Sequence, residues 1–128
     1  MIGPKAYIHL DRLKNNIRNI RKNIGDRSLI VVVKANGYGH GYLNISKHLA
    51  GESDIIFAVF TIDEAIKLRK EGVKCPILIF SKIQKEWLEF AYKHKLWINA
   101  CDYEDLKLLS QVYDEKGFCP EIHLEFDT

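Results

Sequence analysis

The chain has 128 residues, of which 47% are hydrophobic and 28% are charged, a balance typical of a soluble globular domain. Its 19 basic and 17 acidic residues leave a formal net charge of +2, which is too small to suggest a nucleic-acid partner. No run of about 20 apolar residues occurs, so we expect neither a transmembrane helix nor a membrane partner. One compact domain is predicted.

Three cysteines, Cys75, Cys101 and Cys119, form no C-x-x-C pair. Their odd number and their spacing predict neither a disulfide framework nor a zinc site. No group of histidines and cysteines has metal-ligand spacing either. We therefore expect no metal, and a reducing, cytoplasmic location for a chain whose first residues lack a signal peptide.

Six short apolar runs recur along the chain and are typical of strands. They are AYIHL (6–10), LIVVV (29–33), IIFAVF (55–60), PILIF (76–80), LWINA (96–100) and EIHLEF (121–126). The second run looks like a strand buried on both faces. Successive runs start roughly 20 to 26 residues apart, which leaves room for a crossover helix but not for a hairpin, so the strands should be parallel.

Segments of helical period lie between these runs. One spans 62–72 and another spans 102–117, and both end at a glycine, a common helix stop. The second begins at Asp102, a plausible N-cap, with Asp105 three residues later. Alternating strands and helices predict an α/β fold, either an open doubly wound sheet or a (β/α)8 barrel. Because a barrel needs about 250 residues, this chain can supply only part of one.

Lys34 stands directly after the strand run 29–33. In parallel α/β folds the carboxyl ends of the strands face the ligand site. Burial disfavours the charged form of a lysine, and the neutral amine can form a Schiff base. The alternative is that the side chain only extends its ammonium into water past the sheet edge.

The turn after Lys34 reads ANGYGHG. Its glycines permit close backbone approach to a ligand, and the Tyr38 hydroxyl can bond a phosphate oxygen. The same residues also suit an ordinary connection from a strand to a helix, with Tyr38 covering the core. The turn is neither G-x-G-x-x-G nor a P-loop, and its residues alone leave both interpretations open.

The stretch VVVKANGYGHG (31–41) closely resembles the pyridoxal-phosphate lysine motif of alanine racemases, usually A-V-V-K-A-N-A-Y-G-H-G. Gly37 replaces the usual alanine. The opening AYIHLDRLKNNIRNIR, the segment FAVFTIDEAIKLRKEGVKCPILIF and the strand IHLEFDT, often H-L-K-M-D-T in the family, are similar too. The resemblance implies that residues 1–128 are the N-terminal portion of a pyridoxal-phosphate-binding (β/α)8 barrel. About five barrel strands would be present, and the C-terminal domain would be absent. In the intact family the run 6–10 would pair either with the barrel or with the sheet of the C-terminal domain, and the second arrangement would leave it without a neighbour here.

The resemblance also implies a function, the interconversion of L-alanine and D-alanine by a homodimer that supplies D-alanine for cell-wall peptidoglycan. Lys34 would bind pyridoxal phosphate and serve as one of two acid–base groups. Tyr38 would reach the cofactor phosphate, and Phe80 would lie near its ring or simply pack in the core. The second base would be a tyrosine of the partner's C-terminal domain, so residues 1–128 alone should be inactive.

Glu125 departs from the family pattern, in which many members carry a carbamylated lysine that orients a substrate-binding arginine. A glutamate supplies negative charge on a shorter arm, or it is an interior carboxylate paired with another cation. His40 would order the motif loop, and His123 would be structural. Two other functions are kept open, a non-catalytic pyridoxal-phosphate-binding barrel and a purely structural fragment.

Overall fold

Five parallel strands form one sheet in the computed structural model, which describes residues 3 and 5–126. Each strand pairs with the next one along the chain, in the order β1-β2-β3-β4-β5. Helices alternate with the strands, so the predicted α/β class is confirmed, with the arrangement of an incomplete (β/α)8 barrel. The strands are β1 (Leu29–Val32), β2 (Ile55–Val59), β3 (Ile77–Ile79), β4 (Leu96–Ala100) and β5 (Glu121–Leu124).

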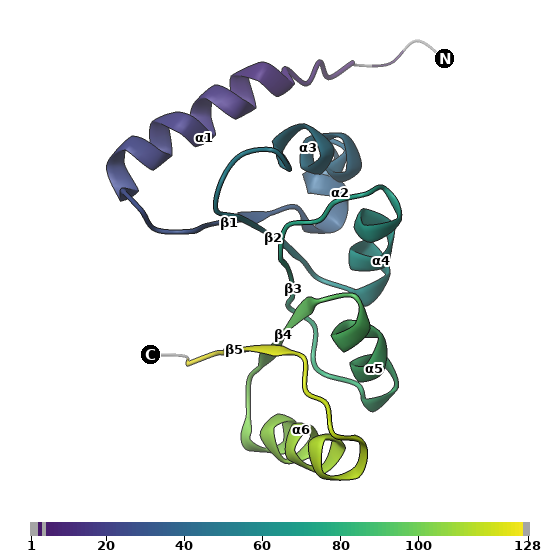
Figure 1. Cartoon of the computed structure of the whole chain (residues 1–128). Helices are drawn as coiled ribbons and strands as arrows, with labels where there is room; N and C mark the ends of the chain where they lie inside the picture. The colour runs from purple at the N-terminus through teal and green to yellow at the C-terminus, as the bar shows by residue number, and fades with distance from the viewer. Residues whose placement is uncertain (1–2, 4, 127–128) are drawn as a thin grey trace.

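Helices cover one face of the sheet, and the other face is open (Figure 1). The core lies between the strands and these helices, and its largest side chains, such as Phe57, Leu68 and Leu88, are almost fully buried. No helix in the described part of the chain is long and apolar enough to cross a membrane. The helices are α1 (Leu10–Ile24), α2 (Lys34–Tyr38), α3 (Tyr42–Leu49), α4 (Ile62–Lys70), α5 (Lys85–Lys93) and α6 (Tyr103–Lys116).

The predicted helix at 102–117 is confirmed as α6, and its caps explain its bounds. The Asp102 carboxylate accepts a hydrogen bond from the Asp105 amide at 2.9 Å, and Gly117 has the left-handed backbone of a C-terminal stop (φ 72°). The Asp105 carboxylate accepts from the Cys101 amide at 3.0 Å. It therefore satisfies a backbone donor one residue before the N-cap.

The strand predicted at 6–10 is wrong. Residues 5–9 have no regular structure, and α1 begins at Leu10. A strand needs a neighbour for its backbone hydrogen bonds, and the five-stranded sheet offers this segment none. Tyr7 is consequently 78% exposed.

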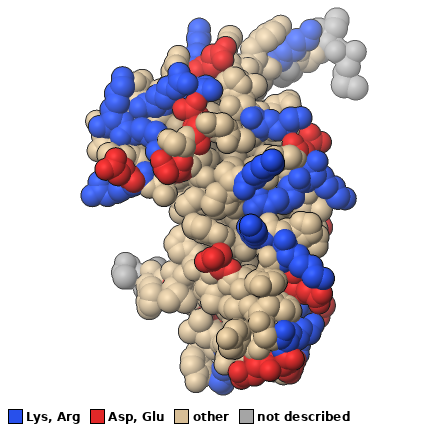
Figure 2. Space-filling view, viewed as in Figure 1, with Lys and Arg blue, Asp and Glu red and all other residues tan. Residues whose placement is uncertain are grey.

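The expectation that the run 29–33 is buried on both faces is also wrong. Ile30 and Val32 are 38% and 40% exposed, because they point to the open face of the sheet. The part of the surface that lies over the strands carries few charged side chains, whereas charges gather over the helices (Figure 2). A small apolar cluster of Ile56, Ala58 and Leu78, flanked by Phe80 and Trp97, occupies this open face.

Candidate active site

A hollow of about 490 Å³ lies on the open face, at the carboxyl ends of the strands. This is the end at which parallel α/β proteins bind ligands. A larger hollow of about 640 Å³, near Pro76, Trp97 and Glu121, lies at the opposite ends of β3, β4 and β5. The larger hollow also has lysines and Cys119 in its lining, so the smaller one is taken as the candidate site because of its place at the carboxyl ends of the strands. Its lining comprises Ile30, Lys34, Phe60, Leu78, Phe80, Asn99, His123, Leu124, Glu125 and Phe126.

Lys34 lines this hollow together with two aromatic rings. Its Nζ lies 5.9 Å from the ring centre of Phe60 and 5.8 Å from that of Phe80, within the range of a cation–π contact. The two phenylalanines directly follow β2 and β3. Adjacent parallel strands therefore bring together side chains that are 26 and 46 residues from Lys34 in the sequence. Phe60 was not predicted as a site residue, although it is the last residue of the apolar run 55–60, just as Phe80 is the last of the run 76–80.

The chain after Lys34 makes a left-handed turn. Ala35, Asn36, Gly37 and Tyr38 have φ values of 52°, 56°, 60° and 55°. Three of these are not glycine, and such a conformation costs roughly 1–2 kcal/mol for each L-residue with a side chain. Two backbone hydrogen bonds of 2.9 Å, from the Gly37 amide to the Val33 carbonyl and from the Gly41 amide to the Asn36 carbonyl, close the turn.

His40 stabilises the same turn. Its Nδ1 lies 2.8 Å from the Gly37 carbonyl oxygen, which can only accept, so Nδ1–H is the donor. Its backbone amide donates to the same oxygen at 3.1 Å. These contacts agree with the interpretation that His40 orders the loop.

Glu64 lies at the start of helix α4 and links the left-handed turn after Lys34 to the segment that carries Phe60 and Thr61. Its Oε1 accepts from the Ala35 amide at 2.9 Å, and its Oε2 accepts from the amides of Phe60 at 2.9 Å and Thr61 at 3.1 Å. The Thr61 hydroxyl accepts in return from the Glu64 amide at 3.3 Å. This is a capping box. Glu64 was not predicted as a site residue, although the pattern T-x-x-E before a helical segment indicates a capping box.

Tyr38 lies on the same turn as Lys34 but is 63% exposed. It is absent from the lining of the hollow among the residues that the structure describes. The turn therefore brings the Tyr38 backbone close to Lys34 and leaves the tyrosine side chain facing outward.

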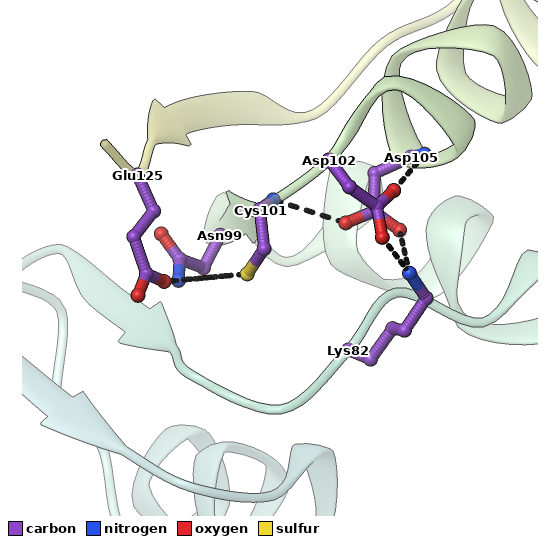
Figure 3. Close-up of polar contacts among 6 residues, drawn as sticks. All are labelled: Lys82, Asn99, Cys101, Asp102, Asp105 and Glu125. Carbon is purple, nitrogen blue, oxygen red and sulfur yellow. Dashed lines mark hydrogen bonds and ion pairs between the residues drawn. The ribbon is translucent and has the colours of Figure 1, made fainter. Parts of the chain in front are cut away.

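Glu125 and Asn99 of β4 line the hollow, and both contact Cys101, which directly follows β4 (Figure 3). Glu125 Oε2 accepts from Asn99 Nδ2 and from Cys101 Sγ, the latter at 3.3 Å. Burial and the hydrogen bond to Glu125 raise the pKa of the Cys101 thiol. Lys82 pairs instead with Asp102 and Asp105 (Figure 3). Within residues 3 and 5–126, no ion pair involves Glu125.

His123 pairs in register with Asn99 and lines the same hollow. Across the described part of the chain, no three His, Cys, Asp or Glu side chains gather as metal ligands would. The polar wall of the hollow is thus built by Asn99, His123 and Glu125, and its apolar wall by the two phenylalanines.

Residues 8–128 match the family model described as alanine racemase, N-terminal domain. The alanine racemase of Macrococcus caseolyticus is 34% identical over 121 residues, which cover 94% of this chain and 32% of the relative. Alanine racemase 1 of Bacillus subtilis is 36% identical over 124 residues, which cover 96% and 31%. The chain thus spans about a third of the length of these relatives.

Solved structures agree with the sequence matches. Alanine racemase of Clostridium difficile in complex with cycloserine superposes with a TM-score of 0.80 and 29% identity, covering 96% of this chain and 35% of that one. Alanine racemase from E. faecalis gives 0.80 and 31%, covering 94% and 33%. A match over nearly all of the chain, in both sequence and fold, shows that this protein belongs to the alanine racemase N-terminal domain family.

Proposed function

We propose that this chain is the cofactor-binding part of a pyridoxal-phosphate-dependent racemase that interconverts L-alanine and D-alanine. Residues 1–128 would form the N-terminal portion of its barrel domain. The observation that carries the proposal is the amine of Lys34, whose Nζ lies 5.9 and 5.8 Å from the ring centres of Phe60 and Phe80 in a hollow of about 490 Å³. Membership of the alanine racemase family supports the choice of reaction.

The side chains around this hollow suit pyridoxal phosphate. The aldehyde of pyridoxal phosphate forms a Schiff base with an amine, and Lys34 is the lysine among the residues that line the hollow. The rings of Phe60 and Phe80 offer flat apolar surfaces to a planar heterocycle. Tyr38, which is exposed and outside the lining, would have to turn toward the hollow for its hydroxyl to donate to a phosphate oxygen. When bound, the cofactor supplies an electron sink that allows the α-proton of an amino acid to leave.

Lys34 then acts as an acid–base group on one face of the substrate. Its neutral amine takes a proton at the α-carbon, and its ammonium form returns one. Inversion requires a second base on the opposite face. We assign that base to a part of the protein outside these 128 residues, contributed by the second subunit of a homodimer. The small amino-acid substrate would lie between the two.

Glu125 would hold a substrate-binding arginine from outside this chain. The donor contacts from Asn99 and Cys101 fix its carboxylate at the wall of the hollow, so the charge is already in place. In a protein that carries the substrate-binding part, Glu125→Gln should raise KM with little change in kcat, because the lost interaction is one of binding. Unchanged kinetics would show that Glu125 is structural.

The setting of the reaction is part of the proposal. All three cysteines are free thiols, which supports a reducing, cytoplasmic location. There the product D-alanine would serve cell-wall peptidoglycan synthesis.

Covalent labelling tests the proposal most directly. Purified protein is incubated with pyridoxal phosphate, reduced with borohydride, digested and mapped by mass spectrometry. We expect the label at Lys34. Lys34→Arg should abolish it, whereas Lys82→Arg, which alters an exposed lysine paired with Asp102, should leave it unchanged. A label spread evenly over surface lysines would contradict the assignment. Labelling at Lys34 without D-alanine production by the longer protein would favour a non-catalytic cofactor-binding barrel.

A further inference from the structure

We propose that Glu64 is the positioning residue for Lys34. Its carboxylate holds the left-handed turn against the segment that carries Phe60, and thereby keeps the lysine amine close to the rings of Phe60 and Phe80. The inference rests on the proposed function for the role of Lys34, but the contact that holds the turn is a property of this chain.

The contacts of Glu64 join two parts of the chain that are far apart in the sequence. Two of the three amides that it binds, those of Phe60 and Thr61, belong to its own helix cap. The third is the amide of Ala35, 29 residues away, at 2.9 Å. The capping box itself requires only the bond from the Thr61 amide. The third bond fixes the peptide group that directly follows Lys34.

The turn needs such a bond because its conformation is intrinsically disfavoured. Ala35, Asn36 and Tyr38 all have positive φ angles without being glycine, and backbone of this kind persists only where its surroundings hold it. A hydrogen bond to a charged acceptor is about twice as strong as a neutral one. If the bond from the Ala35 amide were lost, the strained turn could relax toward an ordinary backbone conformation, which would move the Cα of Lys34 and carry its side chain away from the rings.

Only a carboxylate can make all three bonds at once. Glu64 is half-buried and faces a small hollow that Lys34, Ala35, Phe60 and Thr61 also line. Both of its oxygens face backbone donors. A glutamine in its place would keep one oxygen but turn an NH2 group toward the remaining N–H. The oxygen that it keeps can retain the two bonds from Phe60 and Thr61, which share Oε2, or the single bond from Ala35, so the bond from Ala35 is the one expected to be lost.

Two variants separate positioning from helix capping. Glu64→Gln should break the link to Ala35. Thr61→Ala removes the hydroxyl that caps the Glu64 amide and leaves the bond between Glu64 and Ala35 intact. Both weaken the start of α4, so Thr61→Ala is the matched control. Glu64→Asp keeps the charge at the helix start on a shorter arm, and serves if the glutamine variant does not fold.

Amide exchange gives the first measurement. Hydrogen–deuterium exchange at the Ala35 amide, read by mass spectrometry with fragmentation, should become roughly 10- to 100-fold faster in Glu64→Gln, as expected for a lost bond to a charged acceptor. Glu64→Asp should show the same direction of change. Thr61→Ala should exchange at Ala35 like the original protein. Unchanged exchange at Ala35 in both Glu64 variants would overturn the proposal.

Labelling gives the second measurement. The share of borohydride-fixed pyridoxal phosphate found at Lys34, relative to surface lysines, should fall in Glu64→Gln and stay constant in Thr61→Ala. Faster exchange at Ala35 with an unchanged share at Lys34 would show that Glu64 holds the turn without positioning the amine, and would overturn the proposal. Failure of the original protein to label at Lys34 would refute the proposed function instead, and the exchange result would still decide whether Glu64 locks the turn.

Discussion

At each end of helix α4, a charged side chain forms hydrogen bonds with backbone groups of neighbouring segments. The charge is negative near the start of the helix and positive near its end. Near its start, Glu64 accepts hydrogen bonds from three backbone amides at the carboxyl ends of the strands. Near its end, Arg69 donates to four backbone carbonyls at the amino ends, those of Val73, Cys75, His94 and Lys95, over 2.7–3.0 Å. Both charges also complement the helix dipole.

The difference lies in what each charge holds. Arg69 joins the segments that lead into β3 and β4, and those segments carry no residue of the candidate site. Burial lowers the pKa of Arg69, so its charge is kept at a desolvation cost that the four carbonyls offset. Glu64 joins the segment that carries Lys34. One end of the helix therefore serves stability, and the other serves the reactive residue, as expected for the two faces of a (β/α)8 barrel.

Replacing Arg69 should give the largest loss of stability. Arg69→Met leaves four carbonyls without their donor, of which those of Val73 and Cys75 are partly buried, and we expect the free energy of unfolding to fall by about 2–4 kcal/mol. Denaturant unfolding measures it. The control is Arg18→Met, which removes a more exposed arginine paired with Glu52 and should cost less than about 1 kcal/mol. Equal losses in the two variants would remove the contrast between the two ends of α4.

Substitutions in the left-handed turn should have smaller effects of opposite sign. Gly37→Ala adds a Cβ 3.3 Å from Ile45 Cδ1 at a φ of +60°, and should destabilise the protein by about 1–2 kcal/mol. Ala35→Gly relieves strain at φ 52° and should stabilise it by up to about 1 kcal/mol. Thermal or denaturant unfolding measures both.

The Ala35→Gly change also sharpens the role of Glu64. If the carboxylate is needed because the turn is strained, the double variant with Glu64→Gln should recover part of the Lys34 labelling that the single Glu64→Gln variant loses. A double variant that labels no better than the single one would show that strain at Ala35 is not what Glu64 counters.

The smallest effect concerns Glu125, a carboxylate whose partners are side chains. The pKa of the Cys101 thiol is raised by burial and by Glu125. Glu125→Gln should therefore lower that pKa, increase the thiolate fraction near pH 7.5 and speed alkylation by iodoacetamide a few-fold. The gain should vanish at high pH, where the thiol is fully ionised in both proteins.

A parallel pair elsewhere in the chain supplies the control. Burial and then the charge of Glu121 raise the pKa of Cys119, so Glu121→Gln should speed alkylation at Cys119 and not at Cys101. If Glu125→Gln accelerated all three cysteines alike, loosening of the fold rather than local charge would be the cause.

The sequence predicts most of this architecture because the strands coincide with short apolar runs. Five of the six predicted strands form, each within one or two residues of its predicted bounds. The run at 6–10 fails because strand formation depends on a partner, which local composition cannot reveal. The proximity of Lys34 and Phe80 follows from topology, since neighbouring parallel strands end side by side.

The remainder of the site depends on backbone geometry that residue types only partly specify. The glycines indicate an unusual turn, but nothing in Ala35, Asn36 or Tyr38 requires positive φ angles. The sequence predicts only part of the role of Glu64, because T-x-x-E indicates its bonds within the helix cap. Its bond to Ala35 depends on how closely two loops approach in the folded protein.

Strand order that equals chain order has a consequence for how the protein is made. Three groups near Lys34, namely Phe60, Glu64 and Phe80, all lie within the first 80 residues, and the last of them directly follows β3. Each strand pairs with the one that precedes it, so the sheet can grow in one direction as the polypeptide leaves the ribosome. The surroundings of the lysine can thus be assembled early in synthesis, before β4 and β5 join the sheet.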